Sequence, residues 1–88
     1  MLLLSRVLSS IVLHTLGALQ DVEVIVGMKI QELRKKKGFT QDQFASRAGL
    51  NRTHLYRLES GRLSITLRTL KIVADALEIR VRDLVRDV

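Results

Sequence analysis

The chain of 88 residues contains no cysteine, no proline and only three aromatic residues, Phe39, Phe44 and Tyr56. The absence of cysteine excludes disulfides and thiolate metal sites, and it is the usual composition of a protein in a reducing compartment. We therefore expect a cytoplasmic protein. A chain of this length forms one small domain, whose thin core makes dimerisation a natural source of added stability.

The sequence also lacks the motifs that carry catalysis. There is no HExxH, no glycine-rich phosphate loop and no cysteine nucleophile, and the nine carboxylates are scattered without an obvious pair. His14 has no neighbouring ligand with metal-binding spacing. The sequence therefore predicts a protein that is not an enzyme and that has no metal, no cofactor and no recognisable small-molecule effector site.

Positive charge is concentrated in one part of the chain. Residues 1–27 contain one basic and two acidic residues, whereas residues 28–88 contain the other fourteen basic and seven acidic residues. A basic domain of this kind favours a polyphosphate partner, although such a surface also serves solubility or binding to anionic lipid. Charge alone therefore leaves nucleic acid as one of these alternatives.

The first twenty residues are strongly apolar and have helical periodicity. The longest run without charge is residues 7–20, and this run is shorter than the roughly 18 to 20 residues that span a bilayer. Arg6 interrupts the apolar run where a secretion signal would be unbroken. We interpret residues 1–21 as a helical extension for packing or dimerisation; the alternatives are a membrane-associated segment and a native start at Met28.

The remaining residues, 22–88, show helical patterns and no need for a strand. Residues 22–27 alternate briefly, but the spacing of Val26, Ile30 and Leu33 favours a first helix that runs to about Lys37. Three of the later helices have a capping residue before them: Thr40, Asn51 or Thr66. The predicted later helices are Gln41–Ala48, a helix following Asn51, Leu67–Leu77 and Val81–Arg86.

Residues 41–60 have the pattern of two short helices joined by a tight turn. Ala45 is small enough for a second helix to cross closely, and Gly49 falls where the chain must turn with positive φ. Leu50, Leu55 and Leu58 are spaced to face inward. The outward face of the second helix then carries a row of polar side chains suited to a major groove. This row consists of Arg52, Thr53, Tyr56 and Arg57.

The segments RKKKGFTQDQFASRAGLNRTHLYRLESG and TLRTLKIVADALEIRVRDL, within residues 34–84, resemble the lambda-repressor-like (XRE) helix-turn-helix family. The GLNRT and LSIT stretches are also similar to the controller proteins of restriction-modification systems. The resemblance implies an all-α, five-helix DNA-binding domain, here with an additional apolar helix at the N-terminus. Two positions depart from the family: Glu78 replaces a common glycine, and Arg80 replaces a capping serine.

The resemblance implies roles for particular residues. Arg52 and Thr53, in the first turn of the second helix of the motif, can reach base edges, and an arginine fork can bind guanine O6 and N7. Gln41 is expected to bind a phosphate, and Arg34 and Glu59 are expected to form a structural ion pair. The candidate DNA contacts are Gln41, Asn51, Arg52, Thr53, His54, Tyr56, Arg57, Arg62 and Arg68.

We therefore predict a sequence-specific transcriptional regulator that binds double-stranded, palindromic DNA as a homodimer. The alternative is an antitoxin-like or regulatory module whose N-terminal helix binds a partner protein. An N-terminal helix buried against a second copy favours the first hypothesis, and an exposed apolar groove favours the second.

Overall fold

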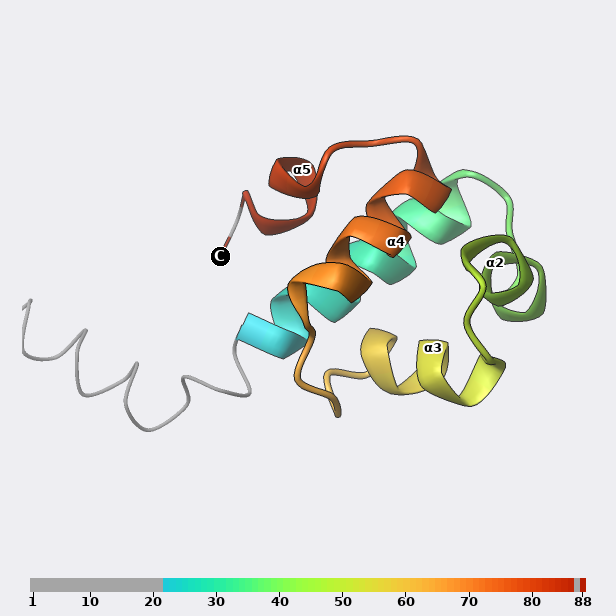
Figure 1. The fold of residues 1–88 in the computed structure, drawn as a ribbon, viewed down its shortest axis with the longest axis horizontal. Coiled ribbons are helices and arrows are strands. Elements are labelled where there is room, and N and C mark those ends of the chain that lie inside the picture. Colours follow the sequence, from blue (N-terminus) through green and yellow to red (C-terminus); the bar gives the residue numbers. More distant parts are fainter. Residues whose placement is uncertain (1–21, 87) are drawn as a thin grey trace, which may run out of the picture.

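The computed structural model describes residues 22–86 and residue 88, which form five helices and no strand (Figure 1). The predicted extension, residues 1–21, lies outside the described residues, so its helical and dimerisation roles stay predictions. The first helix is present, and the alternation in residues 22–27 does not produce an extended segment. The helices are residues 22–36, α2 Gln41–Ala48, α3 Arg52–Glu59, α4 Leu67–Leu77 and α5 Val81–Val85.

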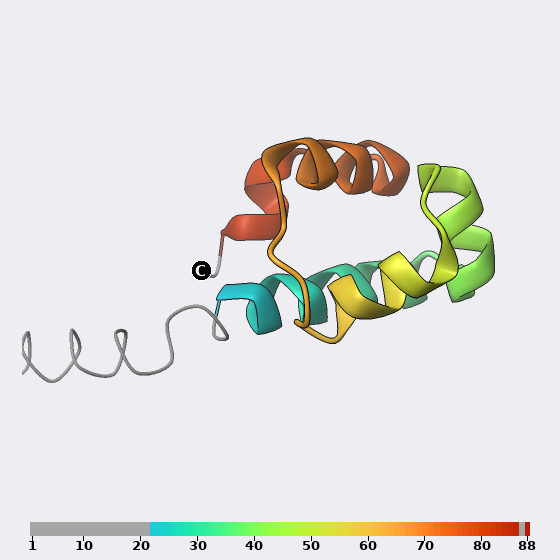
Figure 2. The ribbon, with the colours of Figure 1, turned by 60° about the horizontal axis from the view of Figure 1, so that its bottom comes forward.

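The core lies between the first helix and α4, with α2 and α3 closing one side (Figures 1 and 2). Phe44, Leu55 and Leu77, from three different helices, are completely buried in it. The apolar face of α4 is also buried. The buried apolar side chains are Val26, Ile30, Phe44, Ala45, Leu55, Leu58, Leu70, Val73, Ala74, Ala76, Leu77 and Leu84.

The helices begin where the capping residues predict. The Thr40 hydroxyl accepts the Gln43 backbone N–H, and the Gln43 side chain accepts the Thr40 backbone N–H, so α2 has a complete capping box. Asn51 caps α3 and Thr66 caps α4 through their side-chain oxygens. These caps fix the first turns of three helices by local bonds.

The last helix has a different start, because the guanidinium of Arg80 has no acceptor atom. The Asp83 carboxylate instead accepts the Arg80 backbone N–H at 3.0 Å. The helix ends at Val85, one residue before the predicted end.

Glu78 ends α4 with φ of 59°, the left-handed conformation that explains why glycine would be usual at this position. Arg47 of α2 binds this end of α4 twice: its Nε donates to the Ala76 carbonyl oxygen and its Nη2 to Glu78 Oε1, both at 2.8 Å. Lys37 Nζ lies 3.8 Å from Glu78 Oε2. The acidic side chain thus links this end of α4 to α2.

Gly27 allows the first helix to approach the end of α3 closely. A Cβ atom at this position would overlap the Leu58 carbonyl oxygen and would lie 2.9 Å from the Glu59 carbonyl oxygen. Any side chain here would therefore push α3 away from the first helix.

A buried ion pair joins the same two helices. Arg34 Nε donates to Glu59 Oε2 at 2.6 Å and Nη2 donates to Oε1 at 3.1 Å, while Nη1 donates to the Phe39 carbonyl oxygen at 2.7 Å. Gln41 Nε2 also donates to Glu59 Oε1 at 3.1 Å. The pair predicted from the resemblance is thus present, and it includes the first residue of α2.

Replacing Gly27 with alanine should destabilise the domain by about 1–3 kcal/mol or more, because the new Cβ meets backbone atoms that cannot rotate away. Helix propensity alone would predict the opposite, a gain of about 1 kcal/mol. Urea unfolding followed by circular dichroism measures the difference. Gly38→Ala is the control, because its Cβ meets nothing within 4 Å and only its positive φ costs stability. Unchanged stability of Gly27→Ala would contradict the close approach.

Replacing Glu59 with alanine should cost about 3–5 kcal/mol, because Arg34 would stay buried without its partner. The double variant Arg34→Met with Glu59→Leu should lose less stability than Glu59→Ala, because it leaves no charge in the interior. Denaturant unfolding of the three proteins tests this order. Equal stability of Glu59→Ala and the wild type would show that the pair contributes nothing.

Candidate nucleic-acid interface

The turn between α2 and α3 has the geometry that the sequence predicts. Gly49 has φ of 70°, and the Leu50 backbone N–H donates to the Ala45 carbonyl oxygen at 2.8 Å. Ala45 is buried where α2 meets its neighbours. This closes α2 with a backbone bond and redirects the chain into α3.

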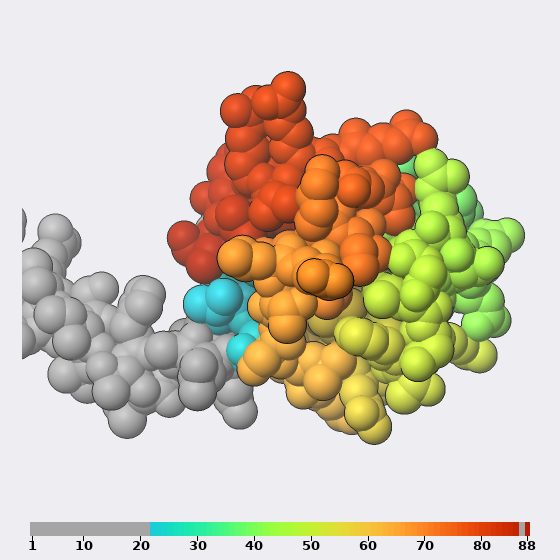
Figure 3. Space-filling view, viewed as in Figure 1, coloured from blue at the N-terminus to red at the C-terminus, as the bar shows by residue number. Residues whose placement is uncertain are grey.

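The inner face of α3 is fixed by buried side chains, and its outer face is exposed. Leu55, Leu58 and Glu59 are buried. The predicted outward row, Arg52, Thr53, Tyr56 and Arg57, is exposed at all four positions. The residues of α2, α3 and the following loop, green to gold in Figure 3, form a continuous surface of the domain.

Arg52 has an acidic neighbour that the sequence interpretation missed. Its Nε lies 3.6 Å from Asp42 Oδ1, and about 70% of each side chain is exposed, 68% for Arg52 and 71% for Asp42. Asp42 lies in the first turn of α2. The two residues are ten positions apart in the sequence, and only the crossing of α2 and α3 brings them together.

Gln41, the predicted phosphate ligand, and Asn51, another candidate DNA contact, both have bonds within the protein. Gln41 is half-buried and donates to Glu59, as described above. The Asn51 Oδ1 accepts the His54 backbone N–H at 2.7 Å. Both residues lie at helix N-termini, where backbone N–H groups and the helix dipole favour an anion.

The remaining candidates lie along the rim of α3 and α4. The Arg62 guanidinium lies 5.9 Å from the centre of the Tyr56 ring, a cation–π contact that links two of the predicted residues. Arg68 is exposed at the start of α4, and His54 is only partly exposed. The structure therefore places Tyr56 and Arg62 in contact. His54 is less accessible to solvent than the outward row of α3.

Sequence reasoning missed three residues around this site. Gly27 and Arg47 act through contacts with other helices, and nothing in their local patterns marks those contacts. Asp42 has one local signal, its position in the first turn of a helix, which predicts only an interaction with the helix dipole. All three are found from the packing of helices.

Residues 22–86 and 88 contain no group of three or more histidine, cysteine or carboxylate side chains that could hold a metal ion. In the same residues no helix is both long and apolar enough to cross a bilayer.

Comparisons with known proteins agree with the geometry. A family model described as helix-turn-helix matches residues 30–84. The immunity repressor protein of Bacillus phage phi105 is 42% identical over 60 residues, which cover 68% of this chain and 42% of the repressor. The chain thus spans less than half of the length of that relative. An uncharacterized HTH-type transcriptional regulator, y4dJ of Sinorhizobium fredii, is 37% identical over 59 residues, which cover 67% of this chain and 77% of that protein.

A solved structure extends the likeness to controller proteins. The restriction-modification controller protein C.AhdI from Aeromonas hydrophila aligns with a TM-score of 0.67 and 34% identity, over 69% of this chain and 92% of that chain. The matched family consists of transcription regulators and not of enzymes. The chain belongs to the helix-turn-helix family of the XRE type, whose members are DNA-binding transcription regulators.

Proposed function

We propose that the protein is a sequence-specific transcriptional regulator of the cytoplasm that binds a palindromic operator as a homodimer. The observation that carries the proposal is the arrangement of α3, which is anchored by buried residues and presents Arg52, Thr53, Tyr56 and Arg57 to solvent. A helix held in this way can enter a major groove with its N-terminal residues against base edges. The relatives named as a repressor, a regulator and a controller protein support the same function.

The side chains on α3 suit base recognition, and those around it suit the DNA backbone. Arg52 can donate two bonds to guanine O6 and N7, and the Thr53 methyl can contact the methyl of thymine. Arg62 and Arg68 are exposed beside the helix and suit phosphate. Gln41 and Asn51 would add phosphate contacts at two helix N-termini. Such phosphate contacts make binding weaken steeply with salt.

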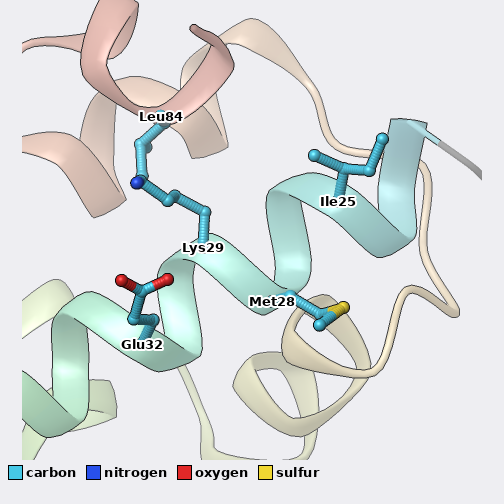
Figure 4. A pocket seen from close by; sticks show the side chains of 5 residues that line it. All are labelled: Ile25, Met28, Lys29, Glu32 and Leu84. Carbon is cyan, nitrogen blue, oxygen red and sulfur yellow. The ribbon is translucent and has the colours of Figure 1, made fainter. Parts of the chain in front are cut away.

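A dimer follows from the symmetry of a palindromic site, whose half-sites lie about one helical turn, roughly 34 Å, apart. The protein offers a surface for a second copy where α5 lies beside the first helix. A shallow recess there is lined by Ile25, Met28, Lys29, Glu32 and Leu84 (Figure 4). Met28 is 61% exposed, and Val85 and Val88 add exposed apolar surface on the C-terminal residues. In both ribbon views α5 and α3 lie on different sides of the domain (Figures 1 and 2), so that contact here leaves α3 accessible.

The same recess supports a second candidate function, an antitoxin-like or regulatory module that binds a different protein. An exposed apolar groove is the feature expected for a heterologous partner, and Met28, exposed in the single chain, would also be covered by a second copy. The oligomeric state of the purified protein separates the two, since a stable monomer in solution would favour a heterologous partner.

Replacing Arg52 with alanine should cost about 1–3 kcal/mol of binding free energy on the operator and should relax discrimination at one base pair. Arg62→Ala should instead weaken binding to all DNA sequences by a similar factor. It should also reduce the salt dependence of the binding constant by about one released counterion. Selection of duplexes from a random pool identifies the operator, and fluorescence anisotropy measures the affinities. Equal losses on operator and random DNA for Arg52→Ala would refute its role in base recognition.

Replacing Met28 with glutamate should shift the protein from dimer to monomer in sedimentation equilibrium, because a buried carboxylate would oppose association at the recess. Leu67→Glu is the matched control: Leu67 is 81% exposed at the start of α4, outside the recess. We expect it to leave the subunit count unchanged. A Met28→Glu protein that remains dimeric would place the dimer contact elsewhere.

A further inference from the structure

The geometry points to Asp42 as a positioning residue that aims the Arg52 guanidinium and so sets the base preference of the protein. This inference rests on the proposed function, because it concerns how one DNA-contacting side chain is oriented. It adds a residue of α2, outside the outward row of α3, to the determinants of specificity.

Asp42 stands out among the acidic residues of the motif. Only two carboxylates lie on α2 and α3, and the other, Glu59, is buried in the ion pair with Arg34. Asp42 is exposed, on the helix next to the row that would face DNA. A carboxylate near phosphate groups weakens binding to any sequence by electrostatic repulsion. This repulsion would be offset if Asp42 had a favourable function in the recognition of the correct base.

The contact with Arg52 supplies that function. Asp42 Oδ1 lies 3.6 Å from Arg52 Nε, a distance of an ion pair and longer than a direct hydrogen bond. In the described residues the guanidinium has no other hydrogen bond or ion pair. Because Asp42 is on the Nε side, both Nη groups remain available, and these two groups form the fork that can bind guanine O6 and N7 together.

A long arginine side chain loses rotamer freedom when it binds. An acidic neighbour that already holds the Arg52 side chain in the orientation that suits guanine reduces the entropy that is lost on binding. Asp42 should therefore favour the correct base over other bases, while it disfavours phosphate in general. Asp42 should thereby raise discrimination between operator and other sequences and lower affinity for random DNA. A simple change in protein stability would not change these two quantities in opposite directions.

A purely local role for Asp42 predicts a different result. A carboxylate in the first turn of α2 stabilises that helix by interaction with its dipole. Loss of that interaction would lower the unfolding midpoint, but it would not change which base is preferred at one position.

The experiment uses the full chain and the duplex that the wild type selects from a random pool. Affinities are measured by fluorescence anisotropy for this duplex, for duplexes changed at each half-site position, and for a random duplex. The proteins are the wild type, Asp42→Asn, Arg52→Ala and the double variant. Asp75→Asn is the matched control, because it removes the same charge from an exposed residue of α4 that pairs with Lys71.

For Asp42→Asn we expect discrimination at the base pair contacted by Arg52 to fall about 1.4- to fivefold, the range of coupling for exposed charge pairs. Affinity for random DNA should rise. In the Arg52→Ala background the same substitution should leave discrimination unchanged, and Asp42→Glu should retain part of it. Asp75→Asn should not change the discrimination at that base pair.

Two results would overturn the inference while leaving the proposed function intact: a uniform change by Asp42→Asn on all duplexes, or an equal effect of Asp42→Asn with and without Arg52. If the wild type selects no sequence at all, the proposed function fails and the inference fails with it. Thermal unfolding of each variant checks that the proteins compared are folded.

Discussion

The position of α3 depends on the buried ion pair between Arg34 and Glu59. A charge in the interior is unfavourable unless it is paired and its remaining donors and acceptors are bonded. Here the Arg34 guanidinium bonds Glu59 and the Phe39 carbonyl oxygen, and Glu59 also accepts from Gln41. In the described part of the chain no buried side-chain polar atom lacks a partner. Because these bonds are directional, they set the orientation of α3 as well as its distance from the first helix.

Much of the fold could be predicted because its determinants are local in the sequence. Thr40, Asn51 and Thr66 bind backbone N–H groups three residues later, so that a few letters suffice to place each helix start. Gly49 is required by a single backbone conformation. The outward row on α3 follows from the helical period once Leu55 and Leu58 are assigned to the core. For the candidate site, the sequence could therefore predict which side chains face solvent.

The contacts between helices could not be predicted in the same way. Gly27 lies between the apolar residues Val26 and Met28 and gives no local sign that the Leu58 carbonyl oxygen lies against it. Asp42 meets Arg52 only because α2 and α3 cross at a particular angle. The sequence marks Glu78 as a departure from a common glycine, but its partner Arg47 lies thirty-one residues away. In each case the packing of the helices determines which residue is contacted, whereas the neighbouring sequence is compatible with several contacts.

The Gln41 side chain connects the stability of the domain to the proposed DNA contact. Its amide nitrogen carries two hydrogens, and the bond to Glu59 uses one of them. The second hydrogen and the backbone N–H at the start of α2 can still bind a phosphate oxygen, so the observed bond is compatible with the predicted role. A phosphate held there would be bonded to a residue that also bonds the Arg34–Glu59 pair. Correct placement of the DNA backbone and correct orientation of α3 would then depend on the same group of bonds.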